Sequence, residues 1–163
     1  MLLGYPDQAL QRIQQALTLA QELAHPFMLA YALNSLADVY LLRREATVTQ
    51  ECSGMLMALA REQGFPYWAA TGTIRWGWAL AEQGQAEEGI AQMRHGMAAF
   101  RSLGSSPAPQ FLAWLAKAYG RIGQGEEGPE HIGRDVGSDT PTWRASGLRS
   151  RVVSAERGTH SSV

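Results

Sequence analysis

The chain has 163 residues, of which 45% are hydrophobic and 18% are charged, and its formal net charge is −1. This composition is typical of a folded globular protein and excludes a largely disordered chain. A charge so close to zero gives no electrostatic reason to expect binding to nucleic acid or to an anionic membrane surface.

The start of the chain and its cysteine content indicate a compartment. Met1-Leu2-Leu3 has neither the basic flank nor the long apolar core of a signal peptide, and the apolar runs are shorter than the ~20 residues of a membrane span. Cys52 is the one cysteine, which excludes an internal disulfide and fits a reducing compartment. We therefore expect a cytoplasmic protein.

Two junction motifs recur along the chain with one spacing. Residues 19–27 (LAQELAHPF) match residues 59–67 (LAREQGFPY) forty positions later. A glycine followed by acidic or amide residues begins at Gly4, Gly84 and Gly123, and a degenerate copy lies at 44–46. Proline in the first turn and glycine after the last turn mark the starts and ends of helices. The shared period predicts a repeat of helical hairpins, each burying its apolar face against the next.

The junctions divide the chain into helices. We expect them, in chain order, over residues 6–24, 27–43, 45–63, 66–83, 86–103 and 108–122. Apolar residues inside these segments keep helical spacing, as at Leu10, Ile13 and Leu17 in the first. Small residues stand where two helices would approach closely, and these are Ala9, Ala16, Ala37, Gly77, Gly89, Gly96 and Ala116.

The pattern stops at Gly128, so we expect a helical domain over 1–128 and a disordered tail over 129–163. The tail has nine apolar residues without helical period, and thirteen of its thirty-five residues are Gly, Ser or Thr. An alternative is translation out of frame. In that case one nucleotide was lost or gained near Gly128, and residues 129–163 are the wrong reading frame of a segment that encodes a further helix. The chain also opens on the second helix of a hairpin. We therefore expect a fragment whose two uncovered ends favour self-association.

The recurring positions resemble the tetratricopeptide repeat. The first helix of that repeat has a large residue, then a large-small pair, then an aromatic residue. These positions correspond to three sets of residues here: Leu33, Leu36-Ala37 and Tyr40; Thr73, Trp76-Gly77 and Leu80; and Leu112, Leu115-Ala116 and Tyr119. The resemblance implies an all-α fold, a right-handed α-solenoid of antiparallel hairpins with a period of about forty residues. Residues 60–68 and 77–84 are similar to the repeat arm of bacterial signalling ATPases that also carry an adenylate or guanylate cyclase-like or regulator domain. The resemblance covers residues 2–128 and the arm alone, and no Gly-x-x-x-x-Gly-Lys-Ser/Thr loop is present.

No pattern of residues indicates catalysis, and we expect neither an enzyme, nor a cofactor, nor a metal site. His25, His95, His131 and His160 have no metal-ligand neighbour at helical spacing. The pairs Glu87-Glu88 and Glu126-Glu127 fall in first turns of helices, where carboxylates are stabilised by the helix dipole. Cys52 is expected to be a small buried apolar residue rather than a nucleophile.

In the solenoid that the resemblance implies, the first helices of the hairpins line a concave groove. Helical spacing assigns to it Tyr31, Asn34, Asp38, Thr71, Ile74, Arg75, Trp78, Glu82, Gln110, Ala113 and Lys117. Trp76 occupies a packing slot, so Trp78, two residues later, is expected to face the groove. The mixture of aromatic, amide and charged side chains suits a protein or peptide partner more than an oligonucleotide. The alternative is an unused groove in which a neighbour half covers Trp78.

The predicted function is a noncatalytic interaction or sensor module, which contacts a partner or the other domains of its own protein. Two alternatives from other classes stay open. One is a nonfunctional, decayed fragment of a gene for such an arm. The other is the sensing of a small inducer near Trp78 and Arg75.

Overall fold

The structure is a computed structural model that describes residues 6–123 of the chain. These residues form six helices: α1 (Pro6–Glu22), α2 (Pro26–Leu42), α3 (Ala46–Gln63), α4 (Pro66–Glu82), α5 (Ala86–Ser102) and α6 (Pro109–Arg121). No strand occurs between residues 6 and 123. The prediction of an all-helical fold is confirmed, and each helix begins and ends within two residues of its predicted bounds. The predicted tail and the pair Glu126-Glu127 lie outside the described residues.

The helices end at evenly spaced positions. A residue with positive φ follows each helix, and these residues are Ala24, Arg44, Gly64, Gly84, Gly104 and Gly123. Successive members are twenty positions apart, except for the last pair, which is nineteen apart. Glycine favours this left-handed conformation because it has no Cβ to clash. Two helices and their turns thus repeat about every forty residues, as the junction motifs predict.

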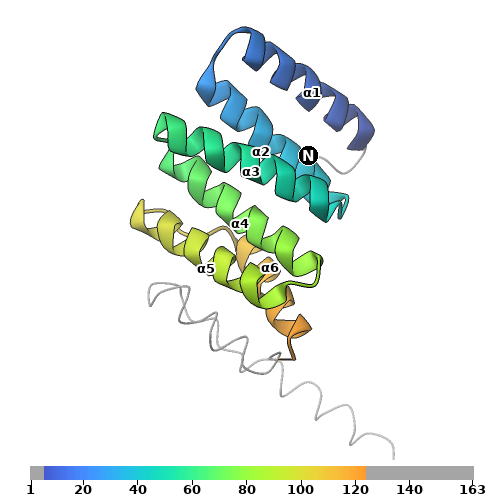
Figure 1. Cartoon of the computed structure of the whole chain (residues 1–163), viewed down its shortest axis with the longest axis vertical. Coiled ribbons are helices and arrows are strands. Elements are labelled where there is room, and N and C mark those ends of the chain that lie inside the picture. Colours follow the sequence, from blue (N-terminus) through green and yellow to red (C-terminus); the bar gives the residue numbers. More distant parts are fainter. Residues whose placement is uncertain (1–5, 124–163) are drawn as a thin grey trace, which may run out of the picture.

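The helices follow one another down the long axis of the molecule (Figure 1), and their contacts divide them into two layers. Each helix packs against the next one in the chain, and α2 also contacts α4, which in turn contacts α6. Over the described residues, α1, α3 and α5 make no such contacts with one another. The even-numbered helices therefore form a row of touching neighbours, and the odd-numbered helices cover one side of that row.

Helices α4 and α5 approach each other closely at glycine residues. A Cβ atom added to Gly77 would lie 2.6 Å from the carbonyl oxygen of Gly89, so the two backbones touch. Gly96 similarly lies against Ile74 and the carbonyl of Ala70. The small residues Gly77, Gly89 and Gly96 thus have the packing role that the sequence predicts.

Two of the small residues predicted at close approaches, Ala16 and Ala116, are instead exposed. Among the described helices, α1 packs against α2 alone, and α6 packs against α4 and α5. The faces that carry Ala16 and Ala116 therefore receive no helix within residues 6–123, and this explains the difference.

Candidate functional site

The side chains predicted to line a groove come from α2, α4 and α6, and we call the eleven of them the even-helix surface. Their exposure differs widely. Tyr31, Gln110, Ala113 and Lys117 are exposed, and Asn34, Asp38 and Glu82 are partly buried. Thr71, Ile74, Arg75 and Trp78 are buried. The structure therefore leaves seven of the eleven at least partly open to solvent.

One polar cluster joins α2 to α4 and reaches α6. The side chain of Arg75 is 4% exposed, and its Nε donates to Asp38 Oδ1 at 2.7 Å. Its Nη1 donates to the carbonyl oxygen of Thr71 at 3.2 Å, and the guanidinium lies 5.9 Å from the centre of the Phe111 ring. A buried guanidinium with a carboxylate, a carbonyl and an aromatic face around it is well compensated for its lost hydration. Arg75 therefore holds three helices of one layer together.

Asn34 adds an unusual feature to this cluster. Its Nδ2 lies 3.5 Å from Asp38 Oδ2, at the limit of a hydrogen bond. Its Oδ1 is buried and has no hydrogen-bond partner among the described residues. Buried side-chain oxygen atoms nearly always accept a hydrogen bond, so this one is an exception within the cluster.

A second cluster joins α4 to α6 at the other end of the row. Glu82 accepts hydrogen bonds from Lys117 Nζ at 2.7 Å and from Arg121 Nη2 at 2.6 Å. Arg121 Nη1 also donates to the carbonyl oxygen of Ala81 in the last turn of α4. Burial tends to raise the pKa of Glu82, but the hydrogen bonds and charges of Lys117 and Arg121 outweigh it and hold that pKa below its ordinary value.

The positions of the tryptophans and of Ile74 differ from the prediction. Trp78 was expected to face an open groove, but it is 5% exposed and lies against Trp114, with ring centres 6.4 Å apart. The packing of α6 on α4 covers it. Trp76, expected in the core, is only partly buried and packs over Gly54. Ile74 faces α5 at Gly96 rather than a groove.

Phe111 and Arg121 contact this surface but are not among its eleven predicted members. Arg121 stands four residues after Lys117, so the helical period already placed both bases on one face of α6, opposite Glu82. The contact between Phe111 and Arg75 joins residues far apart in the chain, and no local pattern signals it.

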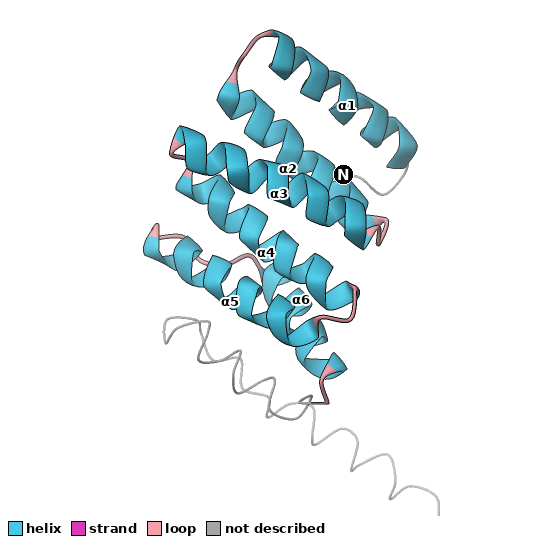
Figure 2. Cartoon of the chain, in the orientation of Figure 1, coloured by secondary structure: helices cyan, strands magenta, loops and turns pink. Residues whose placement is uncertain are grey.

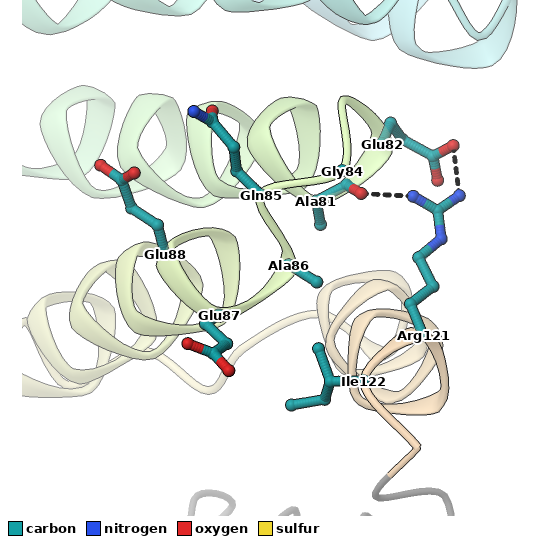
Figure 3. Close-up of a pocket in the computed structure, with 9 residues that line it drawn as sticks. All are labelled: Ala81, Glu82, Gly84, Gln85, Ala86, Glu87, Glu88, Arg121 and Ile122. Carbon is teal, nitrogen blue, oxygen red and sulfur yellow. Dashed lines mark hydrogen bonds and ion pairs between the residues drawn. The ribbon is translucent and has the colours of Figure 1, made fainter.

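A cavity of about 610 Å³ opens where the α4–α5 turn meets the end of α6. Figure 3 shows Arg121 extending from α6 to Ala81 and Glu82, while Glu87 and Glu88 lie on the first turn of α5. The position of Glu87 and Glu88 in that first turn is as predicted. Since the one cation in the lining is already paired with Glu82, the unpaired charge here is that of carboxylates at a helix start, where the dipole stabilises them.

Cys52, His25 and His95 are the described residues whose side chain types most often act as nucleophiles or metal ligands. Residues 6–123 contain no group of three His, Cys, Asp or Glu side chains that could hold a metal ion. Cys52 is 3% exposed, and burial raises the pKa of its thiol to about 11, so it is a thiol and not a nucleophilic thiolate at neutral pH. His25 caps α2, where its Nδ1 accepts from the backbone N–H of Met28 at 3.4 Å, and His95 is exposed.

Comparisons with family models, with curated proteins and with solved structures found no match to this chain. Among the described helices, none is long and apolar enough to cross a membrane.

Proposed function

We propose that the chain is a tetratricopeptide-like α-solenoid that acts, without catalysis or a cofactor, as a protein-interaction or sensor module. In this proposal it works in the cytoplasm as a segment of the regulatory arm of a bacterial signalling ATPase or cyclase-like protein. The even-helix surface binds a peptide or protein partner, or a neighbouring domain of the same protein. The row of contacts from α2 through α4 to α6 is the observation that carries the proposal.

The contact pattern supports a curved stack of hairpins. Helices on the inner side of a curved two-layer stack lie closer together than those on its outer side. Within residues 6–123, the even-numbered helices touch one another and the odd-numbered helices do not. The even-helix surface is therefore the inner, concave side in this proposal, and extended binding surfaces of repeat proteins lie on such sides.

The chemistry of the even-helix surface favours a peptide over a nucleic acid. Its charges balance, since Asp38 and Glu82 pair with Arg75 and Lys117. A phosphate backbone needs an excess of positive charge, and this surface has none. The Tyr31 ring is 56% exposed and Asn34 is partly exposed, so an apolar side chain and a polar group of a peptide are suitable contacts.

Selection of peptides from a phage-displayed library against the full chain tests this proposal. We expect enriched peptides whose binding is at least tenfold weaker on Tyr31→Ala and on Asn34→Leu, with unchanged circular dichroism. Met55→Ala is the matched control, because Met55 is 51% exposed on α3, in the other layer. Peptides that bind all four proteins equally would contradict a binding role for the even-helix surface.

A further inference from the structure

Three inter-helix connections lie along one edge of the molecule. The α1–α2, α3–α4 and α5–α6 connections lie on the left of the view in Figure 2, and each leads into a helix that begins with proline. The first two span residues 23–25 and 64–65, whereas the third spans residues 103–108. The third junction also has Gln110 after its proline, where the other two have Phe27 and Tyr67. The repeat thus departs from its own pattern at the α5–α6 connection.

A cavity of about 540 Å³ lies between this longer connection, the α3–α4 connection and the start of α2. It is lined by the start of α2, the α3–α4 turn with the start of α4, and the α5–α6 connection, through Phe27, Gly64, Phe65, Pro66, Tyr67, Trp68, Leu103 and Ser105. Its volume is within the range of about 300–1,000 Å³ typical of small-molecule sites. None of the lining residues belongs to the even-helix surface, so an inference about this cavity does not depend on the proposed function.

Aromatic rings line the wall of the cavity, and they pack against one another. The Phe27 ring meets Phe65 and Trp68 edge to face, with ring centres 6.0 and 5.9 Å apart. The Tyr67 ring meets Trp68 at 5.1 Å and Phe100 at 5.1 Å. Because three helices hold these rings, the cavity is formed before any ligand enters.

The rings nevertheless leave much apolar surface in water. Phe27 is 50% exposed, Tyr67 is 47% exposed and Leu103 is 41% exposed. An apolar ligand gains free energy by covering such surface, roughly 25 cal/mol for each Å² removed from water. Clusters of exposed apolar side chains commonly mark binding sites.

The lining carries no charged side chain. Its polar side-chain groups are the hydroxyls of Tyr67 and Ser105 and the indole N–H of Trp68. An ionised ligand would lose hydration without a counter-charge, which is costly, whereas a neutral apolar ligand loses little. We propose that this cavity binds an uncharged, largely apolar small molecule with a ring system, whose single polar group meets one of these three polar groups.

Titration of the full chain with N-phenyl-1-naphthylamine, an uncharged dye that fluoresces in apolar surroundings, tests this site. We expect saturable binding of one dye per chain. Ser105→Phe fills the cavity and should weaken dye binding at least tenfold. Ser105 has no positive φ, so the larger side chain adds no backbone strain there. Ser106→Phe is the matched control: Ser106 is exposed in the same connection and does not line the cavity, so its dye affinity should equal that of the wild type.

A second variant covers the case in which Ser105→Phe lowers the melting temperature. Tyr67→Ala removes one exposed wall and should also weaken the dye at least tenfold. Equal dye affinity in the wild type, Ser105→Phe and Tyr67→Ala would overturn the proposal, and so would the absence of saturable binding. Peptides from the library that compete with the dye for the wild type would instead assign the cavity to an apolar side chain of a protein partner, which also overturns a small-molecule site.

Discussion

At the scale of single residues, the helix ends show where the repeat carries strain. The residues after α3, α4, α5 and α6 with positive φ are glycines, but those after α1 and α2 are Ala24, with φ of 46°, and Arg44, with φ of 60°. For a residue with a Cβ, the left-handed conformation costs roughly 1–2 kcal/mol of conformational free energy. The first two helix ends are therefore less favourable than the other four.

Ala24→Gly should stabilise the protein by about 0.5–1 kcal/mol, since it removes this strain and the added entropy of the unfolded glycine offsets only part of the gain. The measurement is the free energy of unfolding in urea. Ala58→Gly is the matched control: Ala58 is exposed within α3, where the same substitution should destabilise by about 1 kcal/mol. Two changes of the same sign would contradict the assignment of strain to Ala24.

The two neighbouring tryptophans of α4 should contribute unequally to stability. Trp78 is 5% exposed and belongs to the main core cluster, so Trp78→Ala should cost roughly 3–5 kcal/mol of unfolding free energy. Trp76 is partly exposed and packs over Gly54, so Trp76→Ala should cost less. Urea unfolding of both variants measures the difference. A larger loss for Trp76→Ala would show that Trp76, and not Trp78, faces the core.

At the scale of helices, the contact between α4 and α5 depends on two glycines. In Gly77→Ala the new Cβ would meet the Gly89 carbonyl at 2.6 Å, and backbone atoms on both sides cannot move aside cheaply. We expect a loss of about 1–3 kcal/mol or more from overpacking. Gly120→Ala on α6 is the control, because a Cβ there meets nothing within 4 Å and alanine favours a helix by about 1 kcal/mol. Thermal melting should therefore shift in opposite directions for the two variants.

The link between α4 and α6 should make stability depend on pH. The pKa of Glu82 is lower in the folded protein than in the unfolded chain, so its contribution is present above the unfolded pKa and is lost as the pH falls through the folded pKa. Between about pH 5 and pH 3, the melting temperature of Glu82→Gln should therefore fall less steeply than that of the wild type. Glu62→Gln, at an exposed position on α3, should retain the slope of the wild type. Parallel slopes for the wild type and Glu82→Gln would exclude this contribution.

The helices could be predicted from local signals, whereas the covered faces could not. Proline and glycine fix where a helix begins and ends, and residues such as Pro66 and Gly64 act within one turn of the chain. Local signals do not show which side of α4 faces the core. Eleven of its residues are buried, and a helix that is apolar on most sides has no single apolar stripe. Trp78 is covered through tertiary packing, in which α6 brings Trp114 against it. For the same reason, the Asp38–Arg75 pair and the cavity beside Ser105 were not predicted, since each joins segments far apart in the sequence.

At the scale of the whole molecule, the packing is strongest in the middle of the stack. Helix α4 contacts α2, α3, α5 and α6, whereas α1 contacts α2 alone within the described residues. Ala20 is the one buried residue between residues 7 and 22. In repeat-like stacks the stability of each unit depends on its neighbours, so a helix with one neighbour opens more readily than a helix with four.

Native-state amide hydrogen exchange measures this gradient. We expect the amides of α4 and α5 to exchange slowest and those of α1 to exchange at least about tenfold faster, since opening α1 exposes little apolar surface. Gly77→Ala should speed exchange in α4 and α5 and leave the ratio between α1 and α2 nearly unchanged, because the strained contact lies away from both. If instead the amides of α1 exchange as slowly as those of α4, residues 6–123 open in a single cooperative step, and the nearest-neighbour account of this stack is wrong.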